Sequence, residues 1–99
     1  MASTKNYLNF ILDELSYLGN ITYKPMMGEY LLYYNNQLFG GIYDDRLLVK
    51  IVDSTKKYHL EETIPYEKGK PMYFIEDIDN KEILKDIVIN TYNDLIKKN

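Results

Sequence analysis

The sequence predicts an α+β fold of two layers, in which an antiparallel meander sheet is packed by an N-terminal and a C-terminal helix. Three observations predict it. Apolar residues recur at helical spacing near both ends of the chain, short stretches of alternating residues fill the middle, and pairs of turn-forming residues separate these stretches. The expected order is helix, three strands, short helix, strand and helix, which is typical of this class. The 99 residues are expected to form a single domain, 1–99, because a chain of this length supports one hydrophobic core.

The first expected helix carries one apolar stripe, whose members are three or four residues apart and therefore share a face. They are Leu8, Ile11, Leu12, Leu15 and Leu18. We expect Ser3 or Thr4 to cap the start of this helix and Gly19 to end it. Residues 21–24 are expected to form a small edge strand or an extended lead-in before Pro25.

A three-stranded meander is expected next, with strands at 29–34, 37–43 and 46–51. The two-residue connections Asn35-Asn36 and Asp44-Asp45 separate these strands. Asparagine tolerates positive φ, which a type I′ hairpin turn requires at both central residues. The pattern therefore predicts two tight hairpins in succession.

Both faces of this meander carry apolar side chains. In its first strand, Tyr30, Leu32 and Tyr34 point to one face, whereas Leu31 and Tyr33 point to the other. One face is expected to lie under the helices. The other would then expose a surface rich in tyrosine and leucine, and such a patch commonly marks association with a partner.

Three elements are expected between the meander and the last helix. A short helical turn begins at Asp53 or Ser54 and ends by 59–60, and the polar segment 61–70 is expected to be mostly loop. A brief strand over 72–76 follows.

The C-terminal helix is expected to begin with a capping box, in which Asp79 is the N-cap and Glu82 reaches back. Lys97 and Lys98 stand at its other end, the favourable side of the helix dipole for a cation. Its apolar stripe consists of Leu84, Ile87, Val88, Thr91, Tyr92 and Leu95.

Composition excludes several classes of site. The chain has no cysteine, which excludes disulfides, a thiolate nucleophile and sulfur-ligated zinc or iron–sulfur sites. The net charge is −3 and the 12 basic residues are dispersed, so direct nucleic-acid binding is disfavoured. No apolar run approaches the roughly 18 residues that span a bilayer, and no signal-peptide pattern opens the chain. A cytoplasmic protein without membrane contact is therefore expected.

No catalytic, cofactor-binding or metal-binding residue is predicted. His59 is the only histidine, and no serine lies on a Gly-x-Ser-x-Gly turn. The acidic groups Asp44-Asp45, Glu61-Glu62 and Glu76-Asp77-x-Asp79 are the candidates for a metal site. A hairpin turn, a loop and a helix cap explain these three groups more simply.

Gly40 and Gly41 lie inside the second expected strand, not before a helix, so they do not form a phosphate-binding loop. Glycine in a strand marks a bulge or a close approach by another group. We expect an aromatic ring, that of Tyr30 or Tyr34 from the neighbouring strand, to cover the notch that Gly40 and Gly41 leave in the strand.

A family resemblance rests on the corner Met26-Met27-Gly28, the strand residues Phe39-Gly40-Gly41 and the later stretch 71–74. The set also includes Tyr30, Asp44, Leu47, Leu48 and Lys50. Over nearly the whole chain, this ordered set resembles the N-terminal domain of the TfoX/Sxy family. The resemblance implies a regulatory module and supplies no catalytic residues. Longer relatives regulate natural competence and add a C-terminal helical domain, which is expected to be missing here because the chain ends at Asn99.

Two functional hypotheses remain open. The first is a non-catalytic regulatory or interaction module that acts through protein–protein contacts with an unidentified partner, of which a homodimer is one form. The second is a small-molecule-binding protein or enzyme with a cleft between the sheet and the 61–70 loop. The interaction surface is expected to include Met26, Met27, Tyr30, Tyr33 and Lys50.

Lys50 has two interpretations. It points away from the apolar neighbours Val49 and Ile51, so it either neutralises Asp44 or Asp45 or contacts an acidic ligand. The pairing with an aspartate is the simpler expectation.

Overall fold

The structure is a computed structural model that describes residues 3–76 and 78–97. It contains two α-helices, two short 3₁₀ helices and a six-stranded sheet. In chain order the elements are α1 (Lys5–Leu15), η1 (Ser16–Leu18), β1 (Ile21–Met26), β2 (Glu29–Tyr34), β3 (Gln37–Ile42), β4 (Leu47–Val49), η2 (Asp53–Tyr58), β5 (Glu61–Thr63), β6 (Met72–Phe74) and α2 (Lys81–Lys97). The predicted α+β class and the order of its main elements are confirmed.

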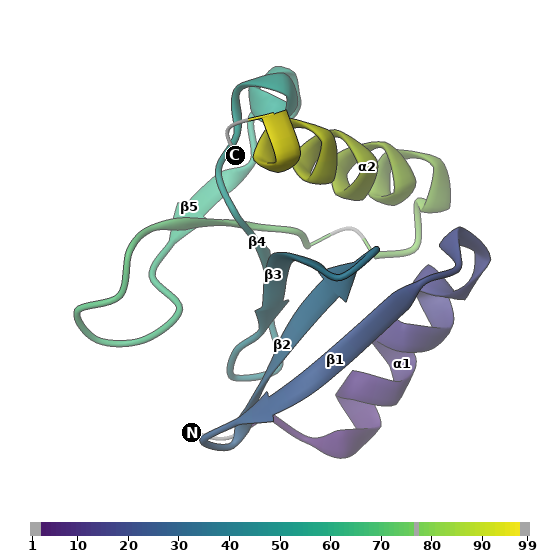
Figure 1. Ribbon diagram of the computed structural model, residues 1–99. Helices are drawn as coiled ribbons and strands as arrows, with labels where there is room; N and C mark the ends of the chain where they lie inside the picture. Colours follow the sequence, from purple (N-terminus) through teal and green to yellow (C-terminus); the bar gives the residue numbers. More distant parts are fainter. Residues whose placement is uncertain (1–2, 77, 98–99) are drawn as a thin grey trace.

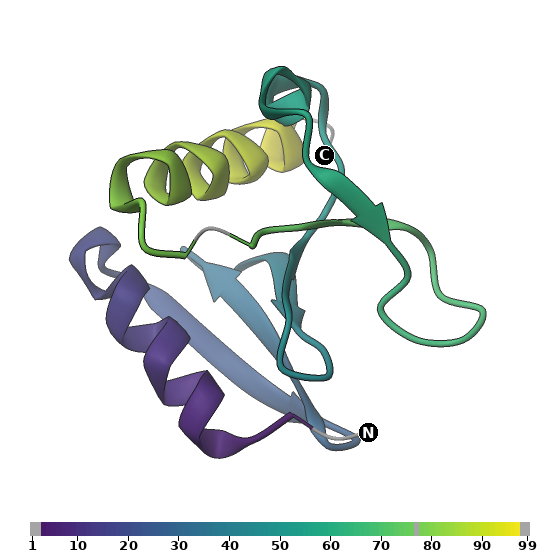
Figure 2. The ribbon, with the colours of Figure 1, turned by 180° about the vertical axis from the view of Figure 1, so that it is seen from behind.

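The sheet is antiparallel throughout, with strand order β1-β2-β3-β4-β6-β5. Figure 1 labels the strands β1 to β5. Side chains of both α-helices pack on the same face of the sheet. In Figure 2, α1 lies in front of the sheet and α2 lies above it. The main core forms between them and the sheet, where both helices contribute fully buried leucine and isoleucine side chains. We call the other side, which no helix covers, the open face.

The helix-facing core follows the predicted stripes. From α1 it takes Leu8, Ile11 and Leu15, and from α2 it takes Leu84, Ile87 and Val88. The sheet contributes Leu32, Phe39, Ile42, Leu47, Val49 and Tyr73. Burial of these side chains is the main favourable term that holds the two layers together.

Thr4 caps the start of α1, as one of the two predicted alternatives. Its extended backbone ends the preceding segment, and its hydroxyl accepts a hydrogen bond from the Tyr7 amide at 3.1 Å. Gly19 follows η1, as expected of a terminating glycine, but its φ of 67° and ψ of 167° are not those of a left-handed cap. This extended conformation with positive φ is one that glycine adopts freely.

Both predicted hairpin turns are confirmed. Asn35 and Asn36 have φ values of 48° and 67°, and Asp44 and Asp45 have values of 53° and 54°. The positive φ at both central residues matches the twist of the flanking strands. A third two-residue turn, at 27–28, joins β1 to β2 in the same way.

The 61–70 segment is mostly loop, as predicted, although β5 occupies its start and pairs with β6 at the edge of the sheet. The predicted N-cap of α2 is wrong. The N-cap of α2 is Asn80, whose side-chain oxygen accepts from the Ile83 amide at 3.2 Å, and not Asp79. Both residues are good caps, and local sequence does not decide between two such neighbours.

Several other outcomes concern boundaries. The segment before Pro25 is a full edge strand, β1, which runs on to Met26. The strands β4 and β6 are shorter than expected, with three residues each. Three residues named above, Asp77, Lys98 and Asn99, lie outside the described residues.

Candidate binding cleft on the open face of the sheet

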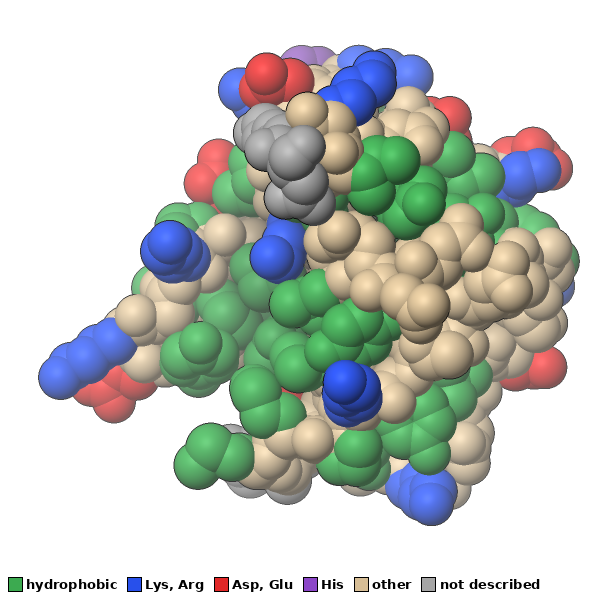
Figure 3. All heavy atoms as spheres, viewed as in Figure 1, with side chains coloured by type: hydrophobic (Ala, Val, Ile, Leu, Met, Phe, Trp, Pro, Cys, Tyr) green, Lys and Arg blue, Asp and Glu red, His purple; other side chains and the backbone are tan. Residues whose placement is uncertain are grey.

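The open face carries a second, smaller apolar cluster. Tyr43, Leu48 and Met72 form its buried part, and the half-buried Met26, Leu31 and Phe74 pack against them. In Figure 3, which shows the molecule from the same side as Figure 1, hydrophobic side chains gather in the middle of the surface with basic groups among them. No helix of the described residues contributes to this cluster, so the open face is an apolar surface in contact with solvent.

A bulge in β3 determines which side chains reach this face. Leu32 pairs with Gly40, but the next residue of β2, Tyr33, pairs with Leu38, so that Phe39 is the extra residue. Phe39 thereby enters the helix-facing core and is fully buried. Leu38 is left half-buried on the open face.

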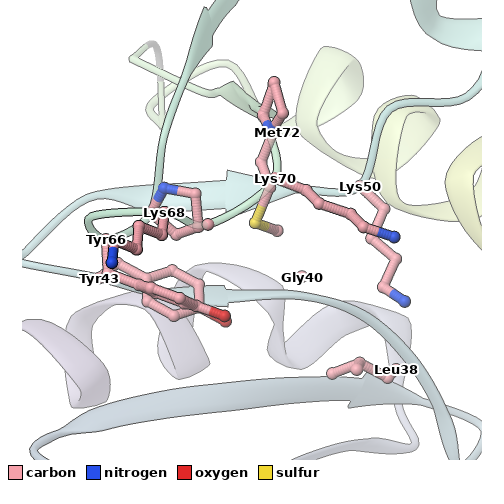
Figure 4. A pocket seen from close by; sticks show the side chains of 11 residues that line it. Leu38, Gly40, Tyr43, Lys50, Tyr66, Lys68, Lys70 and Met72 are labelled. Atoms are coloured by element: carbon pink, nitrogen blue, oxygen red, sulfur yellow. The ribbon is translucent and has the colours of Figure 1, made fainter.

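The loop between β5 and β6, residues 64–71, projects beside the sheet at the left of Figure 1. A cavity of about 510 Å³ lies between this loop and the open face. Leu38 and Tyr43 line it from the side of β3, and Tyr66 and Met72 line it from the side of the loop (Figure 4). The cleft therefore has an apolar floor with two tyrosine rings.

Several interactions hold the loop in place. Arg46 donates from Nη1 to the Thr63 hydroxyl at 3.1 Å and from Nη2 to the Ile64 carbonyl at 3.5 Å. The Tyr66 ring packs against the Tyr43 ring with their centres 6.1 Å apart. The loop is thus tied to the β3–β4 hairpin, which contains Arg46 and Tyr43.

Three lysines line the cleft, namely Lys50, Lys68 and Lys70, and no acidic residue within 3–76 and 78–97 does. Lys50 comes from the segment after β4, whereas the other two belong to the loop. In Figure 4 the ammonium groups of Lys50 and Lys70 point to the same end of the cavity, and Lys68 lies at the end near Tyr66. Among the residues that the structure describes, the ion pairs are Lys56–Asp53 and Lys57–Asp86, so none involves these three lysines.

Tyr43 provides a polar group beside this apolar floor. Burial raises the pKa of its hydroxyl above the ordinary value, and Tyr66, Glu29 and Tyr33 raise it further. The hydroxyl is therefore protonated at neutral pH and can act as a hydrogen-bond donor.

The five residues of the predicted interaction surface do not share one face. Met26, Tyr33 and Lys50 belong to the open face, where the Lys24 ammonium lies 5.4 Å from the centre of the Tyr33 ring. Met27 is the exposed tip of the β1–β2 turn. Tyr30 points to the opposite side and packs against the helix-facing core.

The expected pairing of Lys50 with Asp44 or Asp45 is wrong. The Asp44 amide donates to Glu29, and the Asp45 carboxylate accepts from the Thr4 amide at 2.8 Å. Lys50 instead faces the cleft. Asp44 and Asp45 therefore bond to partners at the turn and at the start of α1. The alternation of side chains along a strand does not predict such bonds.

Glu29 is a structural residue that sequence reasoning missed. Its Oε1 accepts from the Ser3 amide at 2.9 Å, from the Ser3 hydroxyl at 2.6 Å and from the Asp44 amide at 3.1 Å. These bonds join the chain start to two hairpin turns. No local signal marks Glu29, because its partners lie far from it in the sequence.

The described residues assemble no catalytic or metal site that we can identify. His59 ends η2 in a left-handed conformation and is exposed. Within residues 3–76 and 78–97, no three potential metal-ligating side chains come together. No helix in that part of the chain is long and apolar enough to cross a membrane.

A comparison with known protein families places this chain in one of them. The sequence profile described as "TfoX N-terminal domain" matches residues 13–92, most of the chain. The chain belongs to this family. The match spans all six strands, and with them the open face and the cleft.

A relative of this TfoX N-terminal domain protein is found in Spirochaeta aurantia. It is the "Uncharacterized 12.7 kDa protein in trpE 5'region", which is 28% identical over 80 residues. The matched part covers 79% of this chain and 70% of the relative. Its printed name states no activity.

The two glycines in the family motif are explained by crowding. A Cβ at Gly40 would lie 2.2 Å from the Leu48 carbonyl oxygen, and one at Gly41 would lie 2.6 Å from the Tyr30 oxygen and 2.8 Å from the Tyr43 ring. An aromatic ring does cover Gly41, but it is that of Tyr43 and not the predicted Tyr30 or Tyr34. The Tyr30 contact comes from its backbone.

Proposed function

We propose that this TfoX-type domain is a non-catalytic regulatory or interaction module that acts through protein–protein contacts made by its open face. One observation supports the proposal above others. Both α-helices pack on one side of the sheet, and the other side presents half-buried apolar side chains, including Leu31, Met26 and Phe74, to solvent. Surfaces of this kind commonly mark a docking site on a protein. The partner is a second copy of the chain or another protein.

A photo-crosslinking experiment tests this proposal. The photoreactive residue p-benzoylphenylalanine is placed at Tyr33, which is half-exposed on the open face, and the cells are irradiated. We expect a covalent adduct with a discrete partner, identified by mass spectrometry. The matched control carries the same residue at Phe10, which is 42% exposed on α1. Equal adducts from both positions, or adducts from Phe10 alone, would count against the open face as the interface.

A second candidate function is the binding of a small molecule in the cleft. The specific observation in its favour is the cavity of about 510 Å³ between the open face and the 64–71 loop. Ligand pockets commonly have volumes of about 300–1,000 Å³ and predominantly apolar walls. A thermal-shift screen against metabolites tests this candidate, because a compound that binds the native state raises the midpoint of unfolding.

A further inference from the structure

The cleft differs in charge from the rest of the molecule. The chain carries a net charge of −3, yet the cleft is lined by Lys50, Lys68 and Lys70 and by no acidic side chain of the part of the chain that the structure describes. A hollow lined by one sign of charge raises the local concentration of ligands of the opposite sign. The charge distribution therefore favours an anion at this place on an acidic protein.

The lysines come from two separate parts of the chain. Lys50 follows β4 and is half-buried, whereas Lys70 precedes β6 in the loop and is exposed. Figure 4 shows both side chains directed to the same end of the cavity. Neither forms an ion pair with a described residue, so both ammonium groups are available to a ligand.

The floor of the cleft is apolar, which indicates that the ligand carries an apolar part as well as an anionic group. Leu38, Met72 and the ring of Tyr43 line it, and the Tyr66 ring is 57% exposed at the end near Lys68. Apolar and aromatic groups gain free energy by covering such surfaces. A bare inorganic ion would leave this floor in contact with water.

We propose that the cleft binds a small organic anion, in which a phosphate monoester or carboxylate group sits between Lys50 and Lys70 and an aromatic or apolar body covers Tyr43, Tyr66 and Met72. Lysine acts as a compact point charge, so it accepts either anionic group. The inference rests on the second candidate function and specifies its ligand class.

The test is an NMR titration of the ¹⁵N-labelled protein with four probes: phenyl phosphate, benzoate, neutral benzyl alcohol and inorganic phosphate. The amides of Gly40, Lys50 and Gly69 report on the cleft. We expect phenyl phosphate or benzoate to shift these amides at lower concentration than benzyl alcohol or inorganic phosphate. The tighter of the two aromatic anions identifies the preferred anionic group.

Variants assign the binding to the lysines. Removal of two charged partners through Lys50→Gln and Lys70→Gln should weaken binding of the anion by about tenfold or more. The control Lys5→Gln with Lys85→Gln removes two exposed lysines elsewhere and should leave binding unchanged. Lys50→Arg with Lys70→Arg keeps both charges and should retain most of the affinity, and it also shows that the site tolerates substitution.

Two results would overturn the inference, and they have different consequences for the second candidate function. If benzyl alcohol shifts the cleft amides as strongly as the anions, and the glutamine variant binds equally well, the cleft is an apolar ligand site. If no probe shifts these amides up to about 10 mM, beyond the range of even weak binding, the inference and that candidate function fail together.

Discussion

Backbone conformation accounts for most of the side chains at the turns of this protein. Asn35, Asn36, Asp44 and Asp45 all lie in the left-handed region, which asparagine and aspartate enter at low cost. Met27 does not fit this rule. It has a φ of 51° and is 98% exposed, so neither burial nor a local hydrogen bond of its thioether compensates for the conformation. An exposed methionine in a costly conformation is consistent with a role in contacting a partner.

The substitution Met27→Asn should stabilise the protein by about 0.5–1 kcal/mol, because asparagine tolerates the left-handed conformation better than methionine does. The midpoint of urea unfolding measures the change. Met26→Asn is the matched control and should destabilise, since Met26 is half-buried and packs in the open-face cluster. A midpoint that stays the same or falls in Met27→Asn would contradict the explanation from backbone conformation.

The substitution Gly41→Val should destabilise the fold by about 2 kcal/mol or more, because the added atoms meet the Tyr30 oxygen and the Tyr43 ring. Thermal unfolding measures the effect. Thr22→Val, at an exposed position of the edge strand β1, introduces the same side chain where there is room. An unchanged melting temperature in Gly41→Val would show that the notch is not tightly packed.

At the scale of elements, polar contacts join η2 to α2. The Tyr58 hydroxyl donates to the Asp86 carboxylate, and the Lys57 ammonium lies 3.5 Å from the same carboxylate. The Ser54 amide donates to Asp94 at 3.1 Å. These bonds position η2, the connection between β4 and β5, against the last helix, which contains none of the cleft residues.

This contact predicts a dependence of stability on pH. The hydrogen bond from Tyr58 lowers the pKa of Asp86 below its ordinary value of 3.8, with Lys57 adding to the effect. The same bond raises the pKa of Tyr58 above 10.0. A carboxyl group whose pKa is lowered by folding stabilises the fold at pH values above its pKa in the unfolded chain. This stabilisation is lost as the pH falls through the pKa of the folded state. A tyrosine whose pKa is raised by folding stabilises the fold at pH values below its pKa in the unfolded chain. This stabilisation is lost as the pH rises through the pKa of the folded state.

Replacement of Tyr58 by phenylalanine should therefore lower the free energy of unfolding by about 1 kcal/mol or less between roughly pH 5 and pH 9. The cost is small because the Asp86 side chain is 42% exposed. The cost should shrink below about pH 4 and above about pH 10. Urea unfolding of both proteins across pH measures it. In Tyr17→Phe the lost bond runs to the Lys81 carbonyl, so its cost should not shrink on the acid side. A Tyr58→Phe cost that is constant from pH 3 to 8 would contradict the role of Asp86.

At the scale of the whole molecule, the sheet is covered on one side only. The second apolar cluster, on the open face, is closed partly by the 64–71 loop and otherwise meets solvent. The two proposals place different occupants on this face, a protein surface over the sheet and a small anion in the cleft. The proposals differ in the residues on which they depend, Tyr33 for the first and Lys50 and Lys70 for the second.

Self-association through the open face predicts a concentration-dependent mass. Light scattering at about 100 µM should give a value above the 11.8 kDa of one chain. Tyr33→Glu places a charge on the open face and should return the mass to that of a monomer. Phe10→Glu makes the same change on α1 and should not. A strict monomer at this concentration would argue against a homodimer and leave a different protein as the partner.

Much of the fold could be predicted, because its signals are local. The stripes of Leu8, Ile11 and Leu15 and of Leu84 and Ile87 required only helical spacing. The cleft could be predicted only by its place beside the loop at 61–70. Its lysines could not be assigned, because Lys50 and Lys70 are 20 positions apart and meet only when β6 pairs with β4.

Local sequence was sufficient wherever the physical cause lies within a few residues: the period of apolar side chains, the tolerance of asparagine for positive φ and the presence of a cap for α1 at Ser3 or Thr4. The tertiary structure alone decided what depends on distant partners. It selected Tyr43 to cover Gly41, moved Phe39 into the core by a bulge, tied Ser3 to Glu29 and turned Lys50 toward the cleft. Contacts between distant segments follow from the register and twist of the whole sheet, which no short stretch of sequence encodes.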